Sequence, residues 1–105
     1  MRAFQVVVTD DAKADFLRYR NYLIYVKKNS QAARNLLNDY IETRKKLEMV
    51  AESLKEPDSE SLLSRGLKRI NFMRHNYFLL YKVEGKRVFV TNMFHDLGDY
   101  ENKLR

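Results

Sequence analysis

The residues best suited to acid–base chemistry lie near the end of the chain, in the stretch 92–105 (NMFHDLGDYENKLR). His95 ends a strand-like run, and an imidazole there can accept or donate a proton because histidine titrates near neutral pH. Tyr100 can orient a phosphate or stack on a base. The alternative for His95 is structural, since a lone histidine at a strand end is commonly hydrogen-bonded to backbone or to a nearby acid such as Asp96 or Asp99. The pattern leaves both interpretations open.

The remaining reactive groups do not favour metal chemistry. The chain has no cysteine, and its two histidines are far apart in the sequence. Asp96, Asp99 and Glu101 lack other ligand types around them, so we expect them to face solvent or to pair with nearby cations. His75 lies in a turn-like Arg-His-Asn segment, where a structural role is favoured over a catalytic one. We therefore expect no metal and no cofactor.

Net positive charge is concentrated in the segment 65–90. The net charge is +6, and the segment 65–90 holds seven of the 20 basic residues but only one of the 14 acidic ones, so the whole excess lies there. A basic region of this kind favours a polyanionic partner. The alternative is that scattered cations keep the strands soluble and protect a sheet edge.

One short strand and a helix are expected at the start. Residues 4–9 (FQVVVT) form a β-branched run typical of a strand. Asp10 and Asp11 can then cap a helix and place negative charge in its first turn. The buried stripe of that helix is predicted from its apolar positions: Phe16, Tyr19, Leu23 and Val26.

A second, longer helix should form a hairpin with the first. Asn29 is expected to end the first helix and Ser30 to cap the second. The second helix keeps an apolar period for about seven turns, as far as Leu54, and stops before the single proline. Its charged residues, including Asp39 and Glu42, are expected mostly off the buried stripe. Four helix tyrosines are interpreted as core or partner contacts: Tyr19, Tyr22, Tyr25 and Tyr40.

Three strand-like runs follow, at 67–74 (LKRINFMR), 76–83 (NYFLLYKV) and 87–94 (RVFVTNMF), and the last two are joined by a short turn containing Gly85. The middle run is apolar on both faces and should be a central strand covered on two sides. The order β-α-α-β-β-β predicts an α+β fold, with an N-terminal helical hairpin packed on a small antiparallel sheet. We expect a single domain over 1–105, without membrane segment or signal peptide, and hence a soluble cytoplasmic protein with no membrane partner.

Five stretches together resemble the RelE/ParE superfamily of bacterial type II toxins: VVVTDDAKADF, AARNLLNDY, GLKRI, NYFLLYKVEGKRVFV and MFHDLGDYENKL. Their order and spacing carry the resemblance over nearly the whole chain. It implies a small α+β toxin that inhibits growth and is neutralised by a cognate antitoxin, an acidic partner that folds on binding.

The superfamily divides by mechanism. RelE-like members cleave mRNA on the ribosome without a metal, whereas ParE-like members inhibit DNA gyrase. For cleavage, the resemblance and the chemistry of phosphate transfer point to His95, Tyr100 and Arg74 as catalytic residues. The cations expected to bind RNA are Lys68, Arg69, Lys82 and Arg87.

One residue departs from the RelE-like pattern. Many RelE-like enzymes read Tyr-Arg-Leu-Val-Tyr and use that arginine on the phosphate, but this chain has Phe78 at the arginine position. RNA cleavage would then require Arg74 or Arg69 to substitute, and an apolar residue there also resembles ParE. Three functions remain, in order: mRNA endonuclease, gyrase inhibitor, and a non-catalytic module that binds RNA or an antitoxin.

Overall fold

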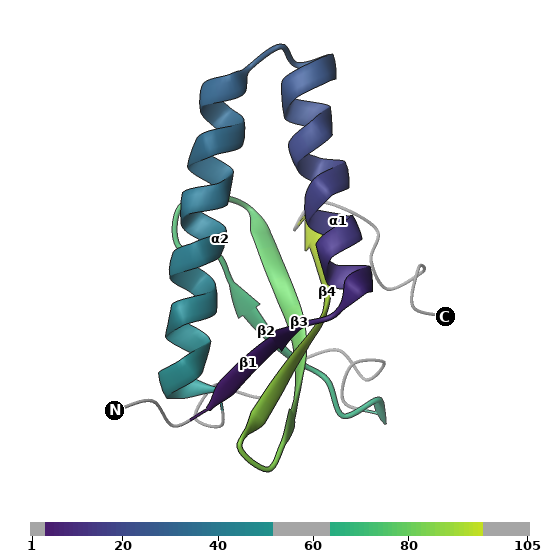
Figure 1. Cartoon of the computed structure of the whole chain (residues 1–105), viewed down its shortest axis with the longest axis vertical. Helices are drawn as coiled ribbons and strands as arrows, with labels where there is room; N and C mark the ends of the chain where they lie inside the picture. The colour runs from purple at the N-terminus through teal and green to yellow at the C-terminus, as the bar shows by residue number, and fades with distance from the viewer. Residues whose placement is uncertain (1–3, 52–63, 96–105) are drawn as a thin grey trace.

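A computed structural model describes residues 4–51 and 64–95 of the chain (Figure 1). Its elements are β1 (Gln5–Val8), α1 (Asp10–Asn21), the π-helical turn η1 (Tyr22–Val26), α2 (Ser30–Val50), β2 (Lys68–Asn71), β3 (Tyr77–Glu84) and β4 (Arg87–His95). The predicted α+β class and element order are confirmed. The predicted end of the second helix at Leu54 lies outside the described residues, as do Tyr100 and the three acids of the tail. No helix in the described ranges is long and apolar enough to cross a membrane.

The four strands form one sheet in the order β1-β4-β3-β2. Strand β3 pairs antiparallel with both β2 and β4, but β1 pairs parallel with β4, so the sheet is mixed rather than wholly antiparallel. The helical hairpin explains the difference, because α1 carries the chain away from the sheet and α2 returns it to the end where β1 begins. There, the Phe4 amide donates to the Glu48 carbonyl at 3.1 Å. Strands β2 and β4 therefore both run in the same direction as β1.

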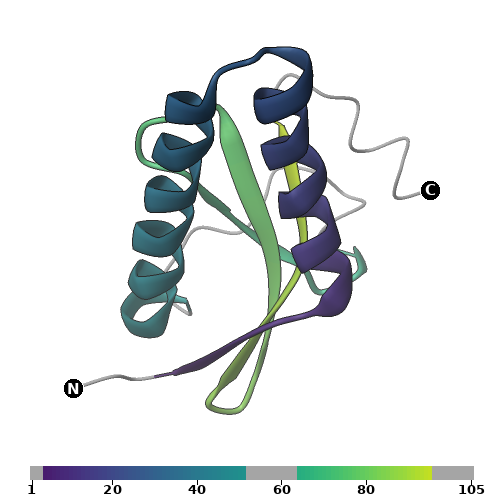
Figure 2. The same ribbon diagram turned by 45° about the horizontal axis from the view of Figure 1, so that its top comes forward.

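Both helices lie over one face of the sheet (Figure 2). The main core lies between these layers and includes Leu36 and Leu47 of α2 against Leu79, Tyr81 and Val90 of the sheet, all fully buried. A second buried cluster on the other face consists of Leu67, Phe78, Leu80 and Phe94. Strand β3 contributes to both clusters, which confirms it as a central strand covered on two sides. Gly85, with φ of +63°, lies in the predicted turn between β3 and β4.

Both helix caps lie one residue earlier than predicted. The Thr9 hydroxyl accepts from the Ala12 amide at 3.3 Å and caps α1, while the Asn29 side chain accepts from the Ala32 amide at 2.9 Å and caps α2. Threonine and asparagine are good N-caps, and Thr9 is in addition held by its hydroxyl donating to the Val90 carbonyl at 2.9 Å. This tertiary hydrogen bond attaches the start of α1 to β4.

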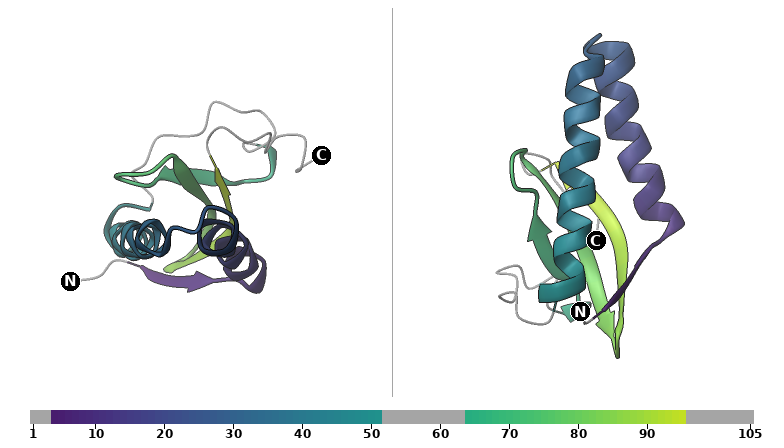
Figure 3. Two further views of the ribbon diagram at one scale, coloured as in Figure 1. Left: turned by 90° about the horizontal axis from the view of Figure 1, so that it is seen from above. Right: turned by 60° about the vertical axis from the view of Figure 1, so that its left-hand side comes forward.

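The helical hairpin projects beyond the sheet, and its tip contains η1 (Figure 3). The Lys27 amide donates to the Tyr22 carbonyl at 3.1 Å, an i to i+5 bond that winds the chain more loosely than an α-helix. Phe16, Tyr19 and Leu23 pack against the core as predicted, but Val26 is 64% exposed. The prediction for Val26 was wrong because the π turn rotates it away from the buried stripe.

Candidate functional site

The free edge of β4 is covered by side chains of α1. Strand β1 ends its pairing at Val8, opposite Val90, so the last residues of β4 have no strand on that side. Two residues one helical turn apart on α1 take the place of a strand: Asp15 accepts from the Met93 amide at 3.0 Å, and the Tyr19 hydroxyl accepts from the His95 amide at 3.1 Å. The edge hydrogen bonds therefore position the backbone of His95 against α1.

Removing these acceptors should loosen the end of β4. We expect Asp15→Ala to lower the free energy of unfolding by about 1–2 kcal/mol and Tyr19→Phe by about 1 kcal/mol, because each leaves a partly buried amide without its acceptor. Urea denaturation measures the loss, and hydrogen exchange should accelerate at Met93 in the first variant and at His95 in the second. Unchanged exchange at both amides would contradict this role of α1.

His95 lines a pocket of about 480 Å³ together with Arg18, Tyr19, Tyr22 and Tyr77. The Tyr77 ring meets His95 edge-on at 4.8 Å between centroids, and Tyr19 meets Tyr77 in the same manner at 5.1 Å. The guanidinium of Arg18 lies 5.3 Å from the centre of the Tyr19 ring. The pocket thus combines an imidazole, a cation and three phenols between α1, η1 and the end of the sheet.

These groups suit a ligand that carries both a phosphate group and an aromatic base. Burial raises the pKa of the Tyr77 hydroxyl, and the neighbouring Tyr19 and Tyr22 raise it further, so Tyr77 is a neutral hydrogen-bond donor at physiological pH. Histidine is the residue type that exchanges protons near neutrality. The Arg18 side chain is 56% exposed and bonded to Asp15 at 3.1 Å, which aligns its cation at the pocket rim. The flat tyrosine rings offer stacking surfaces for a base.

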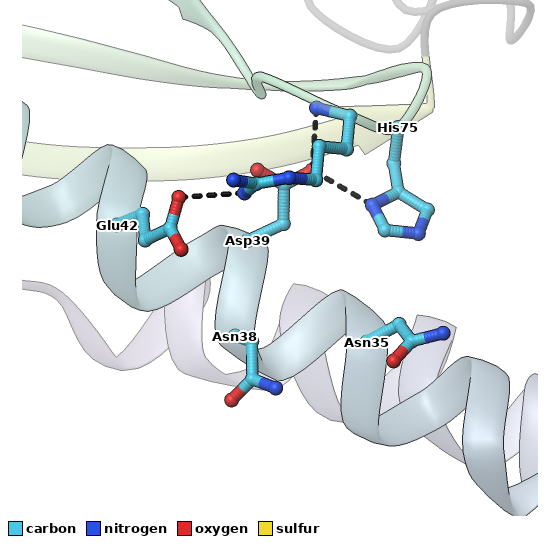
Figure 4. A pocket seen from close by; sticks show the side chains of 6 residues that line it. Asn35, Asn38, Asp39, Glu42 and His75 are labelled. Carbon is cyan, nitrogen blue, oxygen red and sulfur yellow. Dashed lines mark hydrogen bonds and ion pairs between the residues drawn. The ribbon is translucent and has the colours of Figure 1, made fainter.

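A second pocket, of about 470 Å³, lies between α2 and the turn that joins β2 to β3 (Figure 4). At its centre is Asp39, which is 1% exposed. Its carboxylate accepts from three successive residues of the turn: the Met73 amide at 3.1 Å, the Arg74 amide at 2.9 Å and the His75 Nδ1 at 2.7 Å. The prediction that Asp39 lies off the buried stripe is therefore wrong, because this carboxylate finds its partners in a turn far away in the sequence.

The hydrogen bonds around Asp39 keep it ionised. Burial would raise the pKa of Asp39, but the hydrogen bonds from His75, Arg74 and Met73 outweigh burial and hold it below its ordinary value. Arg74 forms an ion pair with Glu42 at 2.6 Å, and this pairing raises the pKa of the guanidinium. The Arg74 backbone and side chain are therefore both bound to acids of α2.

The two predicted catalytic residues that the structure describes, His95 and Arg74, line different pockets. His95 lies in the tyrosine-lined pocket, whereas Arg74 lines the Asp39 pocket. Register places Lys68 on the helix side of the sheet, with Ile70, and the remaining predicted RNA-binding cations on the opposite face: Arg69, Lys82 and Arg87. Lys82 lines a shallow pocket of about 370 Å³ with Arg65. Within the described ranges, no three acids or histidines gather where they could hold a metal.

Phe78 is completely buried in the second core cluster. The guanidinium of Arg69 lies 3.9 Å from the centre of the Phe78 ring, and its Nε donates to the Asn71 side chain at 2.8 Å. Arg69 is thus the cation nearest in register to the position where the RelE-like pattern has its arginine, but the ring and Asn71 hold it on the face opposite His95.

Sequence reasoning missed Arg18, Tyr77 and Asp39 as site residues. Asp39 stands with Leu36, Thr43 and Leu47 at steps of three or four, so a polar residue within an otherwise buried stripe was a usable signal. Arg18 precedes Tyr22 by one helical turn, which could have been noticed. The pairing of Tyr77 with His95 had no local signal because it depends on strand register.

Comparison with solved structures finds the same architecture in a chain of a structure described as "Chromosomal ParDE TA system from P. aeruginosa". The two chains align with a TM-score of 0.70 at 21% identity, over 89% of this chain and 96% of the other. This chain has a ParE-like fold. The RelE/ParE resemblance inferred from the sequence is thereby confirmed for the fold. No family model and no curated protein matches the sequence of this protein.

Proposed function

We propose that the protein is the toxin of a type II toxin–antitoxin pair, and that it arrests growth by cutting mRNA on the ribosome without a metal ion. The fold shared with a ParDE chain supports the first part. The second part is supported by one observation above all: His95, Arg18 and three tyrosines line a single pocket of about 480 Å³.

Metal-free cleavage of RNA needs a proton acceptor, a proton donor and a cation. The 2′-hydroxyl loses its proton and attacks the adjacent phosphorus, the bond to the 5′-oxygen breaks, and that oxygen gains a proton. We assign the proton transfer at one of these oxygens to the imidazole of His95. Arg18 stabilises the growing negative charge on the phosphate, in the role that the sequence assigned to Arg74. The rings of Tyr19, Tyr22 and Tyr77 stack on or hydrogen-bond to the flanking nucleotide.

The proposed toxin requires a partner that silences it. An acidic antitoxin segment that folds on binding suits a chain of net charge +6. The helical hairpin offers apolar contacts for it, because several of its large side chains are more than two-fifths exposed. These side chains are Leu17, Tyr22, Tyr25 and Val26.

Substitution of His95 tests the nuclease assignment. We expect His95→Gln to slow cleavage of ribosome-bound mRNA about 100-fold or more and to relieve growth arrest, because the proton transfer is lost. Arg18→Ala should also slow cleavage, with partial recovery in Arg18→Lys. Cleavage by purified toxin on programmed ribosomes, followed by primer extension, measures the rate. The exposed Lys45→Ala on α2 is the control and should cleave like the wild type.

Inhibition of DNA gyrase is the second candidate. It is favoured by the name of the structural neighbour, a ParDE system. It is also favoured by Phe78, a buried residue at the position where many RelE-like enzymes have an arginine. Parallel incorporation of labelled amino acid and labelled thymidine after induction distinguishes the two. Early loss of translation, absent in His95→Gln, supports the nuclease. Early loss of DNA synthesis, with His95→Gln equally toxic, would replace it with the gyrase inhibitor.

A further inference from the structure

The Asp39 pocket contains a histidine whose orientation is set by a buried carboxylate. A carboxylate can only accept hydrogen bonds, so the contact of 2.7 Å from His75 Nδ1 to Asp39 requires the proton to be on Nδ1. Figure 4 shows the other ring nitrogen, Nε2, turned away from Asp39. The two amide donors from Met73 and Arg74 immobilise the same carboxylate. The imidazole is therefore held in one tautomer with Nε2 directed away from its partner.

The groups that line this pocket match the parts of a nucleotide. Arg74 brings a guanidinium and His75 an imidazole, both suited to a phosphate group. Asn35 and Asn38 bring carboxamides, which have the donors and acceptors that pair with base edges and ribose hydroxyls. A volume of about 470 Å³ lies within the range of small-molecule sites.

The acids of α2 set the conditions under which a phosphate can bind. The groups facing His75 are Asp39 and Glu42 from α2 and Arg74 from its own turn. Asp39 is bound to three donors, but the Glu42 side chain is 45% exposed and contacts Arg74 at 2.6 Å. An exposed pair of this kind is weak, so a phosphate can displace the Glu42 carboxylate from Arg74.

We propose that this pocket is a subsite for one phosphorylated ribonucleotide of the RNA substrate, with Arg74 and His75 as phosphate ligands and Asp39 as the residue that positions His75. The choice of RNA rather than another nucleotide source rests on the proposed function. The subsite lies at the same end of the sheet as the His95 pocket, because Tyr77 pairs with His95 in register and His75 precedes Tyr77 by two residues. An RNA strand crossing this end of the sheet would meet both pockets.

Titration of the full-length protein with adenosine 3′-monophosphate, followed by NMR of the histidine side chains, tests the subsite. We expect saturable shifts of the His75 side-chain signals as the nucleotide is added. Arg74→Ala should weaken binding at least tenfold. Glu42→Gln should tighten it several-fold, because the competing carboxylate is gone. His95→Gln should leave the shifts at His75 intact, and adenosine or inorganic phosphate alone should bind more weakly.

Three results would overturn the subsite: shifts confined to His95, binding indifferent to Arg74→Ala, or weaker binding in Glu42→Gln. Both variants change exposed side chains, so they test the site without dismantling the fold. The ribosome assay separates this inference from the proposed function. If the protein cleaves mRNA but the His75 signals do not shift on addition of the nucleotide, the subsite is wrong and the nuclease assignment stands. Nucleotide binding at His75 without any cleavage keeps the nucleotide subsite and removes the nuclease.

Discussion

Replacing Phe78 with arginine should unfold the domain rather than increase the proposed nuclease activity. The substitution introduces the residue that the RelE-like pattern has at this position, but the Phe78 side chain is fully buried against Leu80 and Phe94. Loss of a buried phenylalanine costs about 3–5 kcal/mol, and an uncompensated buried charge costs more. Because a domain of this size is stable by about 5–15 kcal/mol, we expect most of the variant to be unfolded at 37 °C.

Circular dichroism and urea denaturation measure this effect. Lys82→Ala is the matched control because Lys82 lies on the same strand and the same face but is exposed, and it should change stability by less than about 0.5 kcal/mol. A folded Phe78→Arg protein with faster RNA cleavage would show that the second core cluster can open to admit a cation. The sequence departure at Phe78 would then be a lost catalytic group rather than a core residue.

Removing the Asp39 carboxylate should produce the second large effect. Asp39→Ala deprives the Met73 amide, the Arg74 amide and the His75 ring of their shared acceptor, and we expect a loss of about 3 kcal/mol in the free energy of unfolding. Glu42→Ala, one helical turn away and exposed, should cost less than about 1 kcal/mol. Urea denaturation at pH 7 compares the two variants.

The stability that Asp39 contributes should depend on pH in one direction. Its pKa is lowered in the folded protein, so the unfolded chain binds the proton more tightly than the folded one. The contribution is fully present above the carboxyl's ordinary pKa and disappears as the pH falls through the lowered value. Wild type and Asp39→Ala should therefore converge in stability at strongly acidic pH. An equal difference between them at every pH would show that the effect of the substitution is not electrostatic.

The strands were predictable because their signals are local. Alternation of apolar residues in NYFLLYKV identified a central strand, and the structure places Leu79 and Tyr81 in one cluster and Phe78 and Leu80 in the other. The turn at Gly85 was equally local. The parallel pairing of β1 with β4 was not predictable in this way, because residues 5–8 and 87–90 are joined only by long-range hydrogen bonds.

The wrong predictions for the helices also arise from tertiary structure that local sequence does not specify. Thr9 caps α1 because its hydroxyl also reaches Val90 in β4, a contact that no nearby residue specifies. Val26 leaves the buried stripe because the hairpin closes through a π turn. Asp39 is buried because a turn far away in the sequence supplies three hydrogen-bond donors to its carboxylate. The general expectation that charged residues face solvent therefore failed at Asp39.

Residue order and local periodicity were sufficient for the α+β class, the order of the strands and helices, and the central strand, since each depends on neighbours within one or two turns of helix or one strand. Only the tertiary structure determined which residues line the His95 pocket and the Asp39 pocket. Strand register sets His95 beside Tyr77, and the packing of α1 and α2 on the sheet brings Arg18 to His95 and Asp39 to His75. Contacts between residues far apart in the chain exist only once hydrophobic burial has packed the helices onto the sheet.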